Sequence, residues 1–142
     1  MPILFMISYN KIMQDSIFTK IINGQIPAHR IYEDDRTLAF LDIDPVTPGH
    51  SLVIPKAQVE FAWDLNDEDY QALMATTKKV ARRLREVLGR KYVGQRIVGV
   101  DVPHAHVHVI AFDDASEFSR LSGGQAEPDH AALAALAEKL RF

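Results

Sequence analysis

The sequence of 142 residues contains no cysteine. This absence excludes disulfide bonds, thiolate nucleophiles and every zinc site that uses a cysteine sulfur. Proteins of reducing compartments do not depend on disulfides. We therefore expect a cytoplasmic protein.

The sequence also lacks long apolar runs and a strong excess of one charge. Residues 1–15 contain a short apolar stretch, but no basic segment precedes it and it is too short to span a bilayer. We interpret residues 1–14 as a flexible extension or a misassigned start. The formal net charge of −3 disfavours a protein that coats nucleic acid. Neither nucleic acid nor membrane is expected as a partner.

Glycine and proline are scarce, with seven of each, whereas 47% of the residues are hydrophobic and 25% are charged. This composition is typical of a folded globular protein, and the length matches one domain. We expect a single domain over residues 15–142.

The hydrophobic pattern alternates between helical and strand periodicity. Asp15 or Ser16 is expected to cap a first helix, and Asn66 and Gly89 to bound the longest one. Short connections between strands predict an α+β domain on an antiparallel sheet. The expected helices cover about 16–23, 66–89 and 128–141, and the expected strands 30–35, 37–43, 51–55, 95–102 and 104–112.

Three of the six histidines lie at alternate positions, His104, His106 and His108. In a strand, successive side chains point to opposite faces, so these imidazoles share one face and Ala105, Val107 and Val109 share the other. Three imidazoles in a row are poor core material, because each buried ring nitrogen needs a partner. The row predicts a site of chemistry.

Two chemistries fit a row of histidines. Alternate histidines can converge on one metal ion, with His50 as a fourth ligand. Alternatively, one imidazole attacks phosphorus covalently while another handles the proton of the leaving group. His50 follows a Pro-Gly turn that can bring it towards the row, and no nearby carboxylate spacing suggests a set of oxygen ligands.

The segment HAHVHVI, residues 104–110, resembles the alternating signature of the histidine triad superfamily. Residues 17–56 also resemble the N-terminal half of its purine nucleoside phosphoramidase branch. Together the two matches cover about 15–112. The resemblance implies a five-stranded antiparallel sheet with helices, paired as a homodimer.

The same resemblance implies hydrolysis or transfer at the α-phosphorus of a nucleotide derivative, with no required cofactor or metal. His106 would be the nucleophile that forms a nucleotidyl-histidine, and His108 would bind phosphate and assist the leaving group. His50 and His104 would set tautomers and relay protons. Asp42 would accept the ribose hydroxyls, and Gly99 would let backbone amides approach phosphate. The apolar residues matched to the purine site are Ile17, Phe18, Ile21, Ile26, Phe40, Ile43 and Leu52.

The sequence departs from the pattern of this branch where Asn and a Gly-Gln-Ser/Thr run are usual. Val93, Val100 and Asp101 stand there, and an acidic side chain beside phosphate repels it unless it is protonated, paired or turned away. The cysteine-containing zinc site of some relatives is absent. Three alternatives to a nucleotide hydrolase of this branch remain open: a dinucleoside polyphosphate hydrolase or nucleotidyltransferase, a nucleotide-binding protein with weak turnover, and a histidine-only metal protein.

Overall fold

The computed structural model describes residues 14–124 and 127–142. The interpretation of residues 1–14 therefore lies, apart from Gln14, outside the described residues. No helix within these two ranges is long and apolar enough to cross a membrane.

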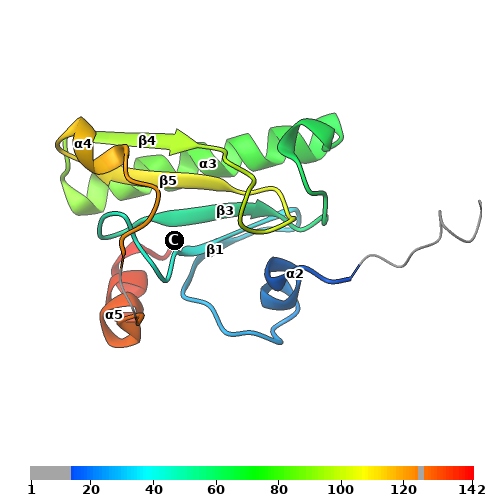
Figure 1. The fold of residues 1–142 in the computed structure, drawn as a ribbon, viewed down its shortest axis with the longest axis horizontal. Coiled ribbons are helices and arrows are strands. Elements are labelled where there is room, and N and C mark those ends of the chain that lie inside the picture. Colours follow the sequence, from blue (N-terminus) through cyan, green and yellow to red (C-terminus); the bar gives the residue numbers. More distant parts are fainter. Residues whose placement is uncertain (1–13, 125–126) are drawn as a thin grey trace, which may run out of the picture.

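Five antiparallel strands form one sheet in the order β1-β2-β3-β5-β4 (Figure 1). This arrangement confirms the α+β class and the five-stranded antiparallel sheet. One crossover, from β3 to β4, leaves a place in the sheet that β5 fills, so the strand that carries His108 lies between β3 and β4. The strands are β1 (Arg30–Glu33), β2 (Thr37–Leu41), β3 (Ser51–Pro55), β4 (Tyr92–Arg96) and β5 (Val107–Phe112).

The helices begin and end at the capping residues that the sequence contains. The Ser16 side chain accepts a hydrogen bond from Thr19 N, and Asn66 accepts one from Asp69 N. Gly89 ends the longest helix in the left-handed conformation, which glycine adopts without steric cost. The helices are α2 (Ile17–Ile22), α3 (Asp67–Leu88), α4 (Ala115–Phe118) and α5 (His130–Leu140), with a 3₁₀ turn η1 at Ala62–Asp64.

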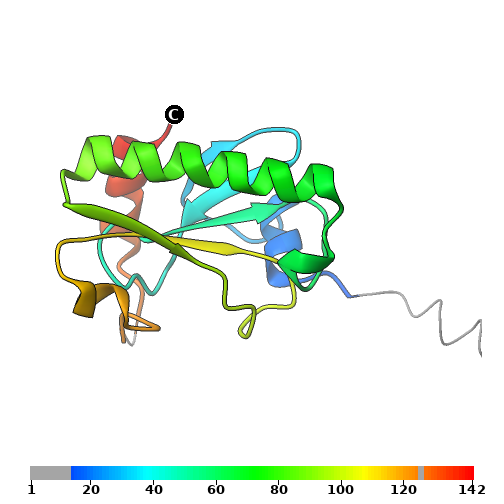
Figure 2. The ribbon, with the colours of Figure 1, turned by 90° about the horizontal axis from the view of Figure 1, so that it is seen from above.

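The sheet separates two groups of buried apolar side chains. Helix α3 runs across one face, as Figure 2 shows, and its Leu73, Val80 and Leu84 belong to the larger group. Helix α5 adds Leu133, Ala137 and Leu140 to that group, as its apolar spacing predicts. Helix α2 covers part of the other face, where the smaller group contains Phe18, Ile21, Leu38, Phe40, Leu52 and Ile54.

Two expectations about the chain after α3 are wrong. The fourth strand covers 92–96 rather than 95–102, and the fifth begins at Val107 rather than at residue 104. Gly99 turns the chain with a φ of 76°, and Pro103 has no N–H to donate to a neighbouring strand, so the segment between the strands is irregular. The short α4, which the sequence analysis did not anticipate, is started by a capping box of Asp114 and Glu117.

Candidate functional site

His50 is placed by the loop that joins β2 to β3. Gly49 has a φ of 90°, and a Cβ there would lie 2.6 Å from Leu88 Cδ1, so the loop needs glycine to close over α3. His50 N–H donates to Thr47 O at 3.0 Å. The turn thereby buries the His50 ring, which is only 1% exposed, against the sheet.

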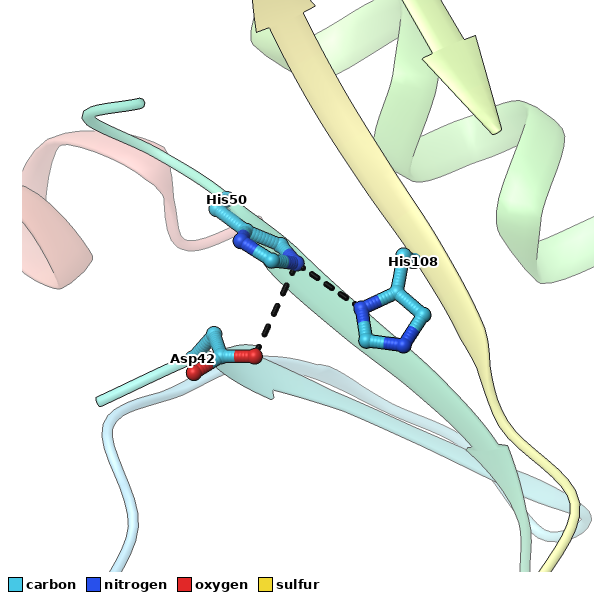
Figure 3. Close-up of side chains that lie close together, drawn as sticks. All are labelled: Asp42, His50 and His108. Atoms are coloured by element: carbon cyan, nitrogen blue, oxygen red, sulfur yellow. Dashed lines mark hydrogen bonds and ion pairs between the residues drawn. The ribbon is translucent and has the colours of Figure 1, made fainter. Parts of the chain in front are cut away.

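A directed hydrogen-bond chain joins this ring to β5. Val46 N–H donates to His50 Nδ1 at 3.0 Å, so the proton of a neutral His50 lies on Nε2. His50 Nε2 lies 2.9 Å from His108 Nδ1 and donates to it (Figure 3). The remaining proton of a neutral His108 is then on Nε2. The chain therefore fixes the tautomers of both rings.

Both rings are held in the neutral form. Burial lowers the pKa of His50 to about 3, and the charges of His108 and Arg96 add to the effect. Burial lowers the pKa of His108 to about 4, with His106 and Arg96 acting in the same direction and Asp101 opposing them. At neutral pH the pair therefore consists of two uncharged imidazoles that can pass a proton.

His106 has the opposite ring orientation. Its Nδ1 lies 2.7 Å from the carbonyl oxygen of His104, which can only accept, so Nδ1 carries the proton. The lone pair of a neutral His106 is then on Nε2. The ring packs edge-on against Phe18 and His108, with centroids 5.1 Å away in each case. This is the arrangement that an imidazole nucleophile requires.

The His104 ring is buried, and both of its nitrogens have hydrogen-bond partners. Its Nε2 donates to the carbonyl oxygen of Pro55 at 2.7 Å, which leaves Nδ1 as the acceptor for the Ser16 hydroxyl at 2.7 Å. Burial lowers the pKa of His104. Because Ser16 also caps α2, one serine joins the start of this helix to the histidine row.

Replacing Ser16 by alanine is expected to lower the free energy of unfolding by about 1–2 kcal/mol, because it removes a helix cap and the short hydrogen bond to the buried His104 Nδ1, whose other hydroxyl contact is Thr19 at 3.4 Å. Urea denaturation of Ser16→Ala checks this value. Ser119→Ala is the matched control, since Ser119 is exposed and its hydroxyl bonds only to Ser116 O. Equal stability of the two variants would contradict the role of Ser16.

The alternation predicted for this segment is confirmed by the packing of the residues between the histidines. Ala105, Val107 and Val109 belong to the apolar group on the α3 side. His108 pairs with Leu52 on β3 and with Arg96 on β4, and directly paired residues share a face of the sheet. The histidines therefore lie on the face opposite α3.

A cavity of about 250 Å³ opens on that face, beside His106 and His108. Every apolar residue matched to the purine site lines it, together with Asp42 and Asp101. Four of these residues, Phe18, Ile21, Phe40 and Leu52, also belong to the smaller apolar group, so they form both a core and a wall. The lining residues are Ile17, Phe18, Ile21, Ile26, Pro27, Ala28, Phe40, Leu41, Asp42, Ile43, Leu52, Asp101, Val102, His106 and His108.

Asp42 lies directly after β2, between the cavity and His50. Its Oδ2 is 3.6 Å from His50 Nε2 (Figure 3). Its Oδ1 accepts from Asp44 N at 2.8 Å. Burial raises the pKa of Asp42, with Asp44 N–H opposing the shift. A partly buried carboxylate that faces an apolar cavity is suited to accept hydrogen bonds from hydroxyl groups.

The three residues at which the sequence departs from the pattern of the branch lie in different surroundings. Asp101 lines the cavity, whereas Val100 is 79% exposed and Val93 packs from β4 against the larger apolar group. Gly99 is not among the residues that line the cavity, and a Cβ at this position would lie 3.8 Å from the Phe61 ring. Its positive φ gives it a role in turning the chain.

Arg96 is the charged residue that the sequence analysis missed. It pairs with His108 across β4 and β5, and its guanidinium donates to the carbonyl oxygens of Phe118 and Arg120. Arg120 in turn donates to Val46 O at 3.0 Å. Arg96 therefore links the segment after α4 to the loop that positions His50. The pairing of Arg96 with His108 could have been predicted only from the register of β4 against β5, and the expected strand boundaries did not give that register.

The donor atoms of Asp42, His50 and His108 lie within 4.8 Å of one another, close enough to consider a metal ion. However, His50 Nδ1 accepts from Val46, and its Nε2 donates to His108. A metal at these atoms would require a His50 ring with no N–H proton. The donor set therefore does not fit a metal in this arrangement.

The chain was compared with known families and proteins. Residues 23–115 match the model of the HIT domain family. An uncharacterized HIT-like protein from Borreliella burgdorferi is 41% identical over 105 residues, which are 69% of this chain and 76% of that protein. A Hit-like protein involved in cell-cycle regulation from Bartonella henselae, solved with an unknown ligand, superposes with a TM-score of 0.77. It is 30% identical, over 89% of this chain and 95% of its own.

Two further structures have names that bear on chemistry. A HIT family hydrolase from Legionella pneumophila is 32% identical, with a TM-score of 0.60 over 68% of this chain and 92% of its own. A zinc-bound histidine triad family protein from Mycobacterium smegmatis is 31% identical, with a TM-score of 0.69 over 87% of this chain and 94% of its own. The first name concerns catalysis, and the second concerns metal binding in that protein.

Proposed function

Because the chain belongs to the HIT domain family, we propose that it hydrolyses or transfers the nucleotidyl group of a nucleoside 5′-phosphate derivative. The observation that supports this most directly is the opposite tautomers of His106 and His108 at one cavity. One ring has a free lone pair and the other a free N–H, as nucleophile and acid require.

The reaction proceeds in two balanced steps. His106 Nε2 forms a bond to the α-phosphorus, and the bond from phosphorus to the leaving group breaks. The leaving group departs with that electron pair and with the proton of His108 Nε2, and a proton from solvent restores the neutral His108 ring. Water then attacks the nucleotidyl-histidine and releases a proton to solvent, and the bonding pair returns to His106 Nε2.

The nucleoside part occupies the apolar wall of the cavity. A purine packs between side chains such as Ile17, Phe40 and Ile43, and Asp42 accepts hydrogen bonds from the ribose hydroxyls. His50 and His104 do not touch the substrate. The His50 ring holds the tautomer of His108, and the backbone carbonyl of His104 holds that of His106. The proposal includes a homodimer in the cytoplasm, as the resemblance implies.

Intact-mass spectrometry tests the proposal. The protein is mixed with adenosine 5′-phosphoramidate and quenched early, beside His106→Asn. A mass increase of one adenylyl group on the wild type alone supports covalent transfer. Tight binding of the nucleotide without adduct or product would instead favour a nucleotide-binding protein. Turnover of a dinucleoside polyphosphate in preference to the phosphoramidate would favour a dinucleoside polyphosphate hydrolase.

No metal ion or other cofactor is required in this proposal. Extended dialysis against a chelator is expected to change turnover by less than about twofold and to leave the melting temperature unchanged, because no protein-held metal contributes to folding or to the nucleophile. Activity and thermal unfolding measured before and after dialysis check this. Loss of either, with recovery on adding zinc, would favour the metal protein.

A further inference from the structure

The cavity has an unusual charge for a site proposed to bind a phosphate. Asp42 and Asp101 are its acidic residues, and none of the described residues that line it is a lysine or an arginine. Of the two lining histidines, His108 is held neutral by burial and does not offset the carboxylates.

The nearest cation does not compensate either. The Arg96 guanidinium donates to the carbonyl oxygens of Phe118 and Arg120 and does not line the cavity. Its two terminal nitrogens are therefore committed to the backbone, and its charge lowers the pKa of His50 and of His108.

Asp101 is placed to act on the leaving group. It lines the same cavity as His106 and His108, and its charge is felt by both His108 and Asp42. The side chain is exposed, and within the described residues no hydrogen bond or ion pair involves it. Its negative charge is therefore available to a group bound beside the reacting phosphorus.

We propose that Asp101 is a specificity-determining residue, which favours nucleotide derivatives whose leaving group is an amine that bears a second, positive charge. This inference rests on the function proposed above and names the substrate class of that site. A cationic leaving group is attracted by the Asp101 carboxylate, whereas a carboxylate or polyphosphate leaving group is repelled.

Two substrates with the same phosphorus–nitrogen bond test the inference. One is the adenosine 5′-phosphoramidate of ethylenediamine, whose free end is an ammonium, and the other is that of β-alanine, whose free end is a carboxylate. At low ionic strength, the wild type is expected to favour the ammonium compound in kcat/KM by about tenfold or more, and added salt should reduce the ratio.

Variants of Asp101 test whether this residue causes the preference for the ammonium compound. Asp101→Asn is expected to bring the ratio of the two kcat/KM values close to one, and Asp101→Lys to reverse it. Asp35→Asn is the matched control, because Asp35 is an exposed acidic residue in the turn between β1 and β2 and should keep the wild-type ratio. Circular dichroism and thermal unfolding verify that each variant is folded.

The outcomes separate this inference from the proposed function. Equal turnover of both compounds by the wild type would overturn the inference and leave the proposed function intact. A preference that survives in Asp101→Asn would show that another group selects the charge. Calorimetric binding of both compounds to His106→Asn measures the charge preference without turnover. If the wild type forms neither product nor adduct, the proposed function fails. Equal binding of the two compounds to His106→Asn would then overturn the inference as well.

Discussion

Replacing His106 by asparagine is expected to lower kcat by at least about 10³-fold, with little change in the fold or in nucleotide affinity. The substitution removes the Nε2 lone pair that the proposed reaction places on phosphorus. It leaves the apolar wall and Asp42 in place. Because His106 belongs to neither apolar group, its loss should not open the core.

Turnover, nucleotide affinity and thermal unfolding of this variant are measured on the same preparation. His130→Asn is the matched control, since His130 is exposed on α5 and contacts only His29 among the ring partners described. It should retain wild-type kcat. An unfolded His106→Asn would indicate a structural role for the ring, and a variant with substantial turnover would refute His106 as the nucleophile.

The free energy of unfolding is expected to fall steeply between pH 6.5 and pH 5. His50 and His108 have folded-state pKa values of about 3 and about 4, below the ordinary value of 6.5. Below pH 6.5 the unfolded chain binds protons at these rings and the folded chain does not. The stability is thus fully present above pH 6.5 and is lost as the pH falls towards the folded-state values.

Each of these two rings should contribute about 1.6 kcal/mol to the loss between pH 6.5 and pH 5, since a full proton difference is worth about 1.4 kcal/mol per pH unit and the unfolded rings are half protonated at pH 6.5. His104, whose pKa is also lowered by burial, acts in the same direction. Urea denaturation at a series of pH values measures the slope. His108→Gln should make the dependence shallower, and a stability that is constant over this range would contradict the neutral pair.

Local signals in the sequence predicted most of the fold. The helix boundaries followed from side chains that satisfy free backbone N–H groups, such as Ser16 and Asn66, and from Gly89 in its left-handed conformation. The alternation of histidine with small apolar residues predicted the two faces of β5, because the side-chain period of a strand is fixed. Such features depend on a few neighbouring residues and can be read without the tertiary structure.

The fourth strand was misplaced because its sequence opposes the usual signals. Gly94 lies in the middle of β4, where the Phe118 ring fills the place of a side chain, while the β-branched residues of 97–102 lie outside any strand. The roles of Arg96 and of the Ser16–His104 bond depend on contacts between segments far apart in sequence. Periodicity does not report such contacts.

The residues matched to the purine site come together more fully than the positions expected to approach phosphate. All seven, together with Asp42 and Asp101, line one cavity, whereas Gly99 is not among its lining residues. The proposed binding residues are anchored on α2, β2 and β3, which are regular elements. Residues 97–106 are irregular, so their placement depends on their own turns.

The division of the apolar residues by the sheet has a consequence for how this protein can change over evolution. The cavity is lined by residues of the smaller group and by residues that belong to neither group, whereas Leu41 alone of the described residues of the larger group lines it. Ile17 and Ile43 line the cavity, belong to neither group and are about half exposed, so under the proposed function preference for a different base can be acquired through them with little loss of folding stability. The architecture permits diversification of ligand choice while the scaffold is retained.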